Sequence, residues 1–213
     1  MNEAGLAYLQ WFYGTNVWKD LYYRGVRTLK LPLDMWNYQE IIFARNIHWI
    51  VETGTRHGGS ALYFADLLAA ANREGGVVSI DVTHEVLDPM VIGHPRIWLL
   101  LGDSAAEPTK QQVMTIIPDK RQGGLLLILD SNHAASHVLR ELATWVPVLK
   151  RGDYLIIEDT IVNGHPVRPE FGPGPMEAVA AFVARNPGRL LADDAREAKF
   201  GCSFAAKGYF VIP

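Results

Sequence analysis

The stretch LLLILDSNHAASH, residues 125–137, decides the fold class of this chain. Its first five residues are apolar without alternation, which is typical of a strand that is buried on both faces of a sheet. The apolar run stops at Asp130, and a helical pattern of apolar residues follows it. A buried strand that leads directly into a helix indicates one unit of a parallel α/β sheet.

The same pattern recurs along the chain. Four further apolar runs are HWIVETG at 48–54, GVVSIDV at 76–82, RIWLLLGD at 96–103 and YLIIED at 154–159. Helices are expected over 60–74, 107–117, 133–150 with a break near Pro147, and 175–185 after a Gly- and Pro-rich loop. Strands that alternate with helices predict right-handed crossovers and a Rossmann-like, doubly wound, mostly parallel sheet.

The chain length predicts one domain. Its 213 residues can form one sizeable core but are few for two. We interpret residues 1–45 as an N-terminal helical cap on a Rossmann-like core that spans 46–213. The cap is rich in aromatic residues, and PLDMWNYQEIIFAR at 32–45 has a helical pattern. Its aromatic side chains are expected to pack against the sheet or to form a homodimer contact. RLLADD and CSFAAKGYFVIP near the other end are expected to close the sheet as two strands, with antiparallel pairing.

Composition narrows the class of protein. The chain has 20 Lys and Arg against 23 Asp and Glu and no basic run, which argues against a nucleic-acid partner. Cys202 is the single cysteine, so the chain cannot form an internal disulfide. The first residues lack the pattern of a signal peptide, and no apolar run approaches the roughly 20 residues of a membrane span. We therefore expect a soluble cytoplasmic protein without a membrane span.

A glycine-rich turn follows the first apolar run, in VETGTRHGGS at 51–60. Its glycine spacing is G-x-x-x-G-G, which differs from the dinucleotide fingerprint, and no P-loop motif is present. Acidic residues at the ends of neighbouring strands can bind an amino group and a ribose hydroxyl pair. An acidic site without a phosphate-binding loop favours S-adenosylmethionine over NAD. The alternative interpretation of the glycine-rich stretch is an ordinary tight turn without a cofactor. The expected cofactor-binding residues are Glu52, Gly54, Thr55, Gly58, Ser60, Asp81, Asp103, Ser104 and Asp130.

Three acids at the ends of the last two apolar runs suggest a metal site. Asp130, Glu158 and Asp159 should lie close together, and carboxylate oxygens suit Mg²⁺ best, with Mn²⁺ or Ca²⁺ as alternatives. Each acid taken alone is explained as well by a helix or turn cap. Adjacent residues of a strand point to opposite faces, so Glu158 and Asp159 can share a metal only where the backbone turns between them.

The histidines have separate expected roles. His133 and His137 have the spacing of a zinc-binding helix, but Ala134 stands where a zinc protease has its catalytic Glu. We expect His133, in the turn after Asp130, to act as a general base and His137 to be structural. His57, His165 and Arg168 are candidates for substrate contact because they lie in loops.

Four motifs, taken in order, carry a resemblance to a known family. They are PLDMWNYQEIIF, VETGTRHGGSALYFADLL, LDSNHAASHVLREL and GDYLIIEDT. Over residues 15–213 the chain resembles the cephalosporin hydroxylase or rhamnosyl O-methyltransferase family, which is similar to the macrocin- and mycinamicin-type sugar O-methyltransferases. The resemblance implies a class I S-adenosylmethionine-dependent methyltransferase fold. It also implies a D-x-x-H motif at Asp130 and His133, with a metal site completed by Glu158 and Asp159.

The implied activity is Mg²⁺-dependent methylation of a hydroxyl group on a sugar, a glycoside or a related natural product. In this reaction Asp130 holds the metal and His133 removes the proton from the hydroxyl. An iron hydroxylase would need two histidines and one carboxylate around an open site, which this pattern does not supply. Two alternatives stay open, an NAD-dependent oxidoreductase and a non-catalytic module that binds S-adenosylmethionine. The identity of the saccharide or small-molecule acceptor also stays open.

Overall fold

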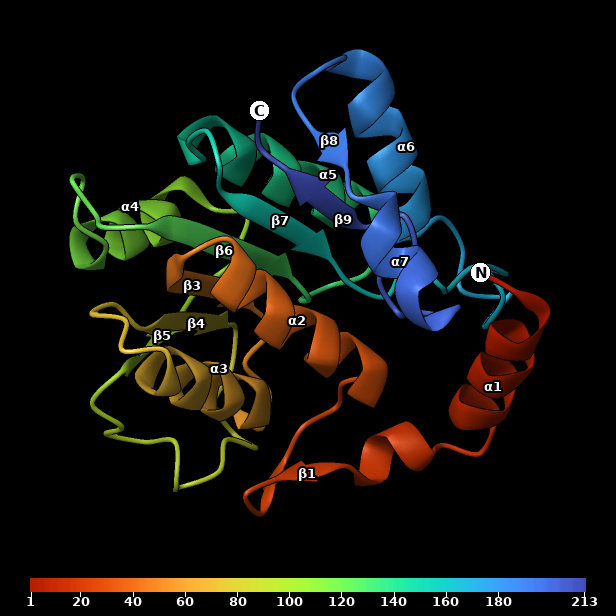
Figure 1. Cartoon of the computed structure of the whole chain (residues 1–213), viewed down its shortest axis with the longest axis horizontal. Coiled ribbons are helices and arrows are strands. Elements are labelled where there is room, and N and C mark those ends of the chain that lie inside the picture. The colour runs from red at the N-terminus through yellow and green to blue at the C-terminus, as the bar shows by residue number, and fades with distance from the viewer.

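The computed structural model describes all 213 residues, and a seven-stranded sheet lies at its centre in the order β5-β4-β3-β6-β7-β9-β8 (Figure 1). The first five strands in this order are parallel, and β9 runs antiparallel to both β7 and β8. Their bounds are β3 Ile47–Thr53, β4 Val77–Asp81, β5 Ile97–Leu101, β6 Gly124–Leu129, β7 Tyr154–Ile157, β8 Leu191–Ala192 and β9 Tyr209–Val211. The structure confirms the doubly wound, mostly parallel sheet that the sequence predicts.

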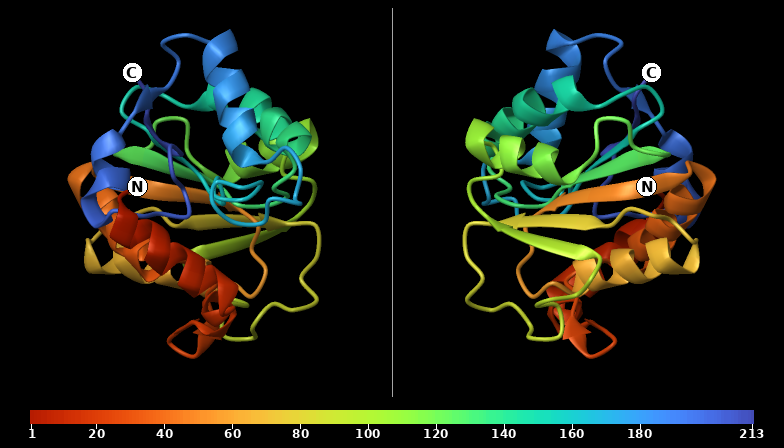
Figure 2. Two further views of the ribbon diagram at one scale, coloured as in Figure 1. Left: turned by 90° about the vertical axis from the view of Figure 1, so that its right-hand side faces the viewer. Right: turned by 90° about the vertical axis from the view of Figure 1, so that its left-hand side faces the viewer.

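Helices cover both faces of the sheet, as the two edge-on views show (Figure 2). One face carries α2 (Pro32–Ala44), α3 (Gly59–Ala70) and α7 (Asp194–Phe200), and the other carries α4 (Glu107–Ile116), α5 (Ala135–Trp145) and α6 (Pro175–Arg185). Each face has its own apolar cluster. None of the helices combines the length and the apolar character that crossing a membrane requires.

Strand β6 shows why the apolar runs are continuous rather than alternating. Leu126 and Ile128 belong to the cluster beneath α2 and α3, whereas Leu125, Leu127 and Leu129 belong to the cluster beneath α4, α5 and α6. Successive side chains of a strand point to opposite faces, and here both faces are covered. Every position of the strand must therefore be apolar.

Local signals set most helix ends. Helix α6 begins at Pro175 as expected, and α5 ends at Trp145, where a short 3₁₀ turn, Val146–Val148, includes Pro147. The two closing strands are confirmed as antiparallel partners. The sequence prediction missed α7, which lies between them, because a helix of seven residues gives too short a pattern to detect.

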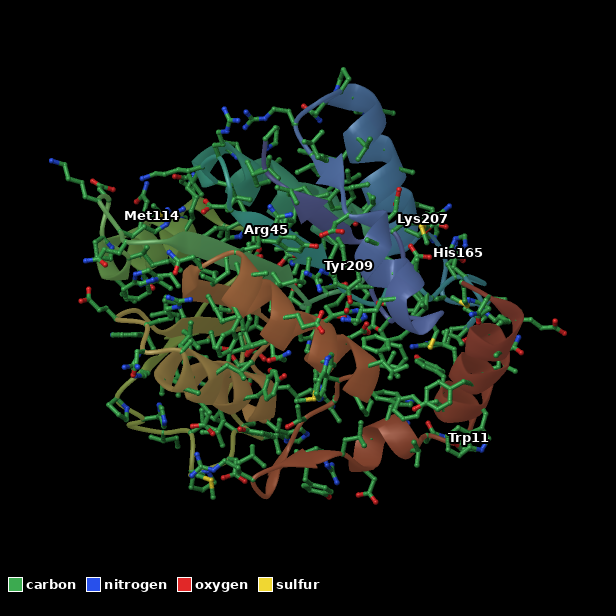
Figure 3. All side chains as sticks on the ribbon, in the orientation of Figure 1. Trp11, Arg45, Met114, His165, Lys207 and Tyr209 are labelled. Carbon is green, nitrogen blue, oxygen red and sulfur yellow. The ribbon has the colours of Figure 1, made fainter.

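The N-terminal segment folds along the carboxyl edge of the sheet. It contains α1 (Glu3–Gly14), a 3₁₀ turn (Val17–Asp20), a hairpin of β1 (Tyr22–Tyr23) and β2 (Val26–Arg27), and then α2. Tyr38 of α2 packs against the sheet as expected, but Leu9 and Phe12 of α1 pack against residues 161–167 and 202–206 instead. Trp11 is 55% exposed at the periphery of the molecule (Figure 3). The division into a cap of 1–45 and a core of 46–213 stays a prediction.

The strand order reverses between β3 and β6. The chain passes from β3 outward to β4 and β5 and then returns to the opposite side of β3. At this reversal the loops after β3 and β6 touch. A Cβ atom at Gly54 would lie 2.0 Å from the carbonyl oxygen of Asp130, and Gly54 has φ +89°, so this position requires glycine. A reversal of this kind is where open α/β sheets bind their ligands.

Truncating β6 at its centre should destabilise the protein. Leu126 is fully buried, so Leu126→Ala should lower the free energy of unfolding by about 2–5 kcal/mol, through lost burial and the cavity that remains. Leu101 on the edge strand β5 is 60% exposed, and Leu101→Ala is the matched control, with an expected change within about 0.5 kcal/mol. Urea denaturation measures both values. Equal losses in the two variants would contradict a core centred on β6.

Candidate functional site

A cavity of about 770 Å³ lies at the carboxyl ends of the parallel strands. Its walls come from the loops that follow β3, β4, β5, β6 and β7 and from the N-terminal segment. The residues that sequence analysis selected and that line this cavity are Gly54, Thr55, His57, Ser60, Asp81, Asp103, Ser104, Asp130, His133, Asp159 and Arg168. The selected residues that are not part of the lining are Glu52, Gly58, Glu158 and His165.

Glu52 lies beneath the glycine-rich loop rather than at the surface of the cavity. Its Oε1 atom accepts hydrogen bonds from Ser60 Oγ at 3.1 Å and from Ser79 Oγ at 2.9 Å. Burial raises the pKa of Glu52 to about 7, although nearby Lys30 and the serine hydroxyls favour its ionised form. Glu52 therefore supports the loop from below, and its direct contact with a cofactor stays a prediction.

Asp81 and Asp103 face the cavity and organise the backbone around it. Asp81 accepts hydrogen bonds from the backbone N–H of Arg56 at 2.8 Å and of Val82 at 2.7 Å. Asp103 accepts one from the backbone N–H of Ala105 at 2.9 Å and one from Arg140 Nη2 at 2.7 Å. Because an ionised carboxylate has about four acceptor positions, both retain capacity for ligand hydroxyl or amino groups.

Asp130, His133 and Asp159 converge at the centre of the cavity. His133 Nε2 lies 3.3 Å from Asp130 Oδ1, and His133 Nδ1 lies 3.4 Å from Asp159 Oδ2. One potential ligand atom from each of the three side chains falls within 4.8 Å of the others. Asp159 has φ +50°, so the backbone does turn between Glu158 and Asp159, as a shared metal site would require.

The charges of this group are strongly coupled. Burial opposes a charged His133, but Asp159 and Asp130 outweigh it and raise the pKa of His133 to about 9. Burial and the neighbouring acids raise the pKa of Asp159 to about 6, even though His133 favours its ionised form. Two carboxylate oxygens with one imidazole nitrogen can hold a divalent cation, and carboxylate oxygen suits a hard cation such as Mg²⁺.

Lys30 joins two of the predicted metal ligands. Its Nζ atom lies 2.6 Å from Asp130 Oδ2 and 2.8 Å from Glu158 Oε1, and the lysine side chain is only 6% exposed. Glu158 also accepts a hydrogen bond from Tyr38 Oη. Glu158 is thus held by Lys30 and Tyr38 beside the group that Asp130 forms with His133 and Asp159, and its role as a metal ligand stays a prediction.

Lys30 is not among the residues selected from the sequence. The only signal was one charged residue between Leu29 and Leu31, just before α2, and a lone lysine in a loop is usually solvated. Its partners are 100 and 128 residues further along the chain. Only the folded chain places its ammonium group between two carboxylates.

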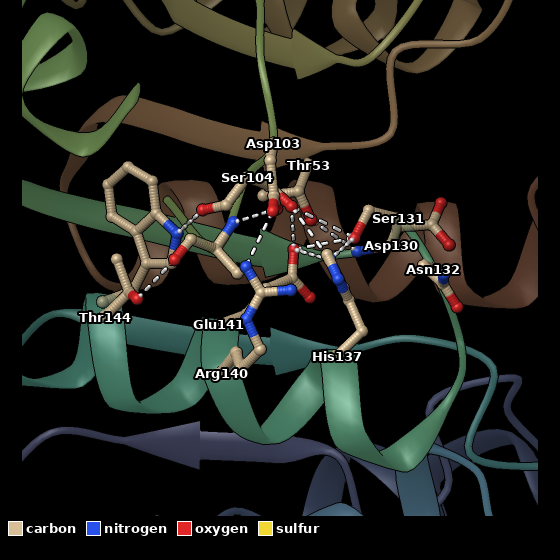
Figure 4. Close-up of polar contacts among 12 residues, drawn as sticks. Thr53, Asp103, Ser104, Asp130, Ser131, Asn132, His137, Arg140, Glu141 and Thr144 are labelled. Carbon is tan, nitrogen blue, oxygen red and sulfur yellow. Dashed lines mark hydrogen bonds and ion pairs between the residues drawn. The ribbon is translucent and has the colours of Figure 1, made fainter. Parts of the chain in front are cut away.

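A polar cluster joins α5 to the strand ends (Figure 4). Glu141 is fully buried, and its Oε1 atom accepts hydrogen bonds from Ser104 Oγ at 2.6 Å and Ser131 Oγ at 2.7 Å. His137 Nε2 lies 3.2 Å from Ser104 Oγ and 3.1 Å from Ser131 Oγ. The cluster therefore fixes the loop after β5 to the loop that carries Asp130, and these contacts favour a positioning role for His137. Ser131 and Glu141 were not selected from the sequence.

The three candidates for substrate contact are separated in the structure. His57 lines the cavity, with Nδ1 2.9 Å from the carbonyl oxygen of Val86, and Arg168 lines it from the loop after β7. His165 lies outside the lining, with Nε2 2.8 Å from Glu177 Oε1. The N-terminal aromatic residues were expected to pack against the sheet or to form a homodimer contact, whereas Tyr13 and Trp18 line the cavity.

Comparisons with known protein sequences show the family of this chain. The profile of a family described as Rhamnosyl O-methyltransferase/CmcI matches residues 15–211. A rhamnosyl O-methyltransferase of Mycobacterium bovis BCG is 39% identical over 204 residues, which cover 96% of this chain and 83% of that protein. A rhamnosyl O-methyltransferase of Mycobacterium leprae is 40% identical over 204 residues, which cover 96% of this chain and 88% of that protein.

Solved structures with the same fold include one of CmcI, described as holding Mg and SAM. It has a TM-score of 0.69 at 25% identity, and the match covers 92% of this chain and 77% of the CmcI chain. The MycE methyltransferase of the mycinamycin biosynthetic pathway, described as a complex with Mg and SAH, has a TM-score of 0.53 at 19% identity. That match covers 74% of this chain and 41% of the MycE chain, and it supports the fold alone.

Removing the buried ammonium group of Lys30 should destabilise the folded protein. Lys30→Met leaves the carboxylates of Asp130 and Glu158 close together without their shared partner, which should cost about 3–5 kcal/mol in the free energy of unfolding. Urea denaturation checks this value. Lys120→Met is the matched control, because Lys120 is exposed, and it should change stability by less than about 0.5 kcal/mol.

The loss in Lys30→Met should also depend on pH. In the wild type, burial alone would raise the pKa of Asp130, but Lys30 and His133 outweigh burial and lower it. Without Lys30, burial favours the protonated form of the Asp130 carboxyl group. The free energy of unfolding therefore falls as the pH rises and Asp130 ionises. The loss in the free energy of unfolding of Lys30→Met, relative to the wild type, should be larger near pH 8 than near pH 5.5. A deficit that is equal at both pH values would contradict this role of Lys30.

Proposed function

Because the chain belongs to the rhamnosyl O-methyltransferase/CmcI family, we propose that it transfers the methyl group of S-adenosylmethionine to a hydroxyl group of a sugar, a glycoside or a related natural product. The proposal includes Mg²⁺, or Mn²⁺ in its place, as a second cofactor. The observation that carries it is the position of Asp130, His133 and Asp159 directly beside the glycine-rich loop. A group that can accept a proton, next to a glycine-rich loop that can approach a cofactor, suits methyl transfer to a hydroxyl group.

The cavity is suited to S-adenosylmethionine beside an acceptor. Its volume of about 770 Å³ lies in the range of cofactor and ligand sites. Gly54 lines the cavity, and Asp81 and Asp103 present acceptor oxygens for hydroxyl and amino groups. The absence of the dinucleotide glycine spacing speaks against NAD. Calorimetric titration with S-adenosylmethionine and with NAD separates the two cofactors.

Residues at the centre of the cavity would hold the metal and the proton. Asp130 and Asp159 would hold the cation. Glu158 would join them only if its carboxylate moved away from Lys30. A cation held there would lower the pKa of the acceptor hydroxyl and would offset the negative charge that keeps a proton on His133. Both ring nitrogens of His133 face carboxylates, Nε2 towards Asp130 and Nδ1 towards Asp159. With those carboxylates on the cation, one ring nitrogen would be free to accept the proton of the acceptor hydroxyl as methyl transfer proceeds.

The acceptor class rests on the names of the relatives. Two curated relatives at 39% and 40% identity are named rhamnosyl O-methyltransferases, so a rhamnosyl group is the first acceptor to test. We also propose, on the sequence alone, a cytoplasmic protein without a nucleic-acid partner that forms a homodimer.

Replacing the proposed base should remove most turnover. His133→Ala should lower kcat for methyl transfer by about 10²–10⁴-fold, because proton removal loses its positioned acceptor, while the affinity for S-adenosylmethionine stays unchanged. Radiolabelled methyl transfer and calorimetry measure the two quantities. His94→Ala is the matched control, since His94 does not line the cavity. An equal fall in cofactor affinity would argue against a role as base.

Removing divalent cations should inactivate the wild-type protein. EDTA should lower the rate of methyl transfer from S-adenosylmethionine to p-nitrophenyl α-L-rhamnopyranoside by at least about 10-fold, and excess Mg²⁺ should restore it. Asp159→Asn should show a similar loss that Mg²⁺ does not restore, because the variant lacks one carboxylate of the group. Full activity in the chelator would rule out the metal.

A further inference from the structure

The cavity has two chemically different halves, and the sheet order separates them. Gly54 follows β3, Asp81 ends β4 and Asp103 follows β5, and these three strands lie on one side of β6. Val162 follows β7, and Phe204 precedes β9, and both strands lie on the other side of β6. The group of Asp130, His133 and Asp159 lies between the halves, at the ends of β6 and β7.

Aromatic side chains of the N-terminal segment cover the second half. The rings of Tyr13 and Trp18 are stacked, with centroids 5.4 Å apart and planes inclined by 19°. Tyr13 also meets Phe204 edge to face, with centroids 6.1 Å apart. Phe204 is buried, and its backbone N–H donates a hydrogen bond to Asp34 Oδ2 at 2.7 Å, which fixes the position of Phe204. All three aromatic residues line the cavity.

Polar groups lie beside these three aromatic side chains. Trp18 Nε1 is buried and has no hydrogen-bond partner, which is costly for an N–H group that can only donate. The Nζ atom of Lys19 lies 5.2 Å from the centroid of the Trp18 ring, and Arg168 lines the cavity from the loop after β7. Aromatic faces beside groups that donate hydrogen bonds fit a ligand with an apolar face and oxygen atoms at its rim.

We propose that Tyr13, Trp18 and Phe204 form the acceptor wall, on which the sugar ring that carries the accepting hydroxyl packs. A pyranose ring presents C–H groups on its faces and hydroxyl groups around its edge, so it matches this combination of aromatic faces and donors. The inference rests on the proposed methyl transfer and adds the residues that select the acceptor. The N-terminal segment is then part of the active site rather than a distant cap.

Trp18→Ala tests the wall. It should raise KM for p-nitrophenyl α-L-rhamnopyranoside by about 10-fold, because the ring loses its aromatic contact, while the Kd of S-adenosylmethionine stays within about 2-fold. Trp36→Ala is the matched control, because Trp36 is 58% exposed on α2 and does not line the cavity, and it should leave KM unchanged. Trp18→Phe keeps an aromatic face and should restore most of the lost affinity for the acceptor.

Each outcome has a separate meaning. Equal KM values in the wild type, Trp18→Ala and Trp36→Ala would overturn the acceptor wall and leave the proposed function intact. If Trp18→Ala raises KM and the Kd of S-adenosylmethionine together, the residue acts on the whole cavity, and the specific acceptor role is also overturned. Methylation of catechol in preference to the glycoside would overturn the sugar as the ligand of the wall. No transfer by the wild type to any glycoside would overturn the proposed function itself.

Discussion

Carboxylates crowded at one edge of the sheet are the constraint on which the rest of the site depends. Parallel strands bring their carboxyl ends together, so partly buried Asp130 and Asp159 meet beside buried Glu158. Like charges at such distances are costly unless cations or protons accompany them. Lys30 and His133 supply that compensation within the chain, and the same concentration of negative charge is what attracts a divalent cation.

The N-terminal segment completes this edge through buried polar contacts. Lys30 reaches the ends of β6 and β7, and Tyr38 donates a hydrogen bond to Glu158. Asp34 accepts hydrogen bonds from Tyr209 Oη at 2.8 Å and from the backbone N–H of Phe204, and burial together with repulsion from Glu158 raises its pKa to about 7. The segment therefore could not detach without exposing unpaired charges, which explains how it can serve as a wall of the cavity.

Two sets of contacts hold the loop that carries Asp130 in place. The close contact of Gly54 with Asp130 fixes the loop after β3 against the loop after β6. The bonds of Glu141 to Ser104 and Ser131 fix that same loop to the end of β5 through α5. A methyl donor near Gly54 and an acceptor near the aromatic wall would then meet at residues whose positions are set by the sheet rather than by mobile loops.

The sequence by itself determined the strands of the central sheet, the helices with strong patterns, and the acids at the strand ends, because apolar periodicity and chain breaks are local properties. It also selected Asp130, His133 and Asp159, since residues just after parallel strands must gather at one edge. Tertiary structure alone decided that Glu158 turns to Lys30, that Trp18 faces the cavity, and that Glu141 unites two loops. These contacts join residues far apart in the chain, and their energies come from burial and charge pairing that no local pattern encodes.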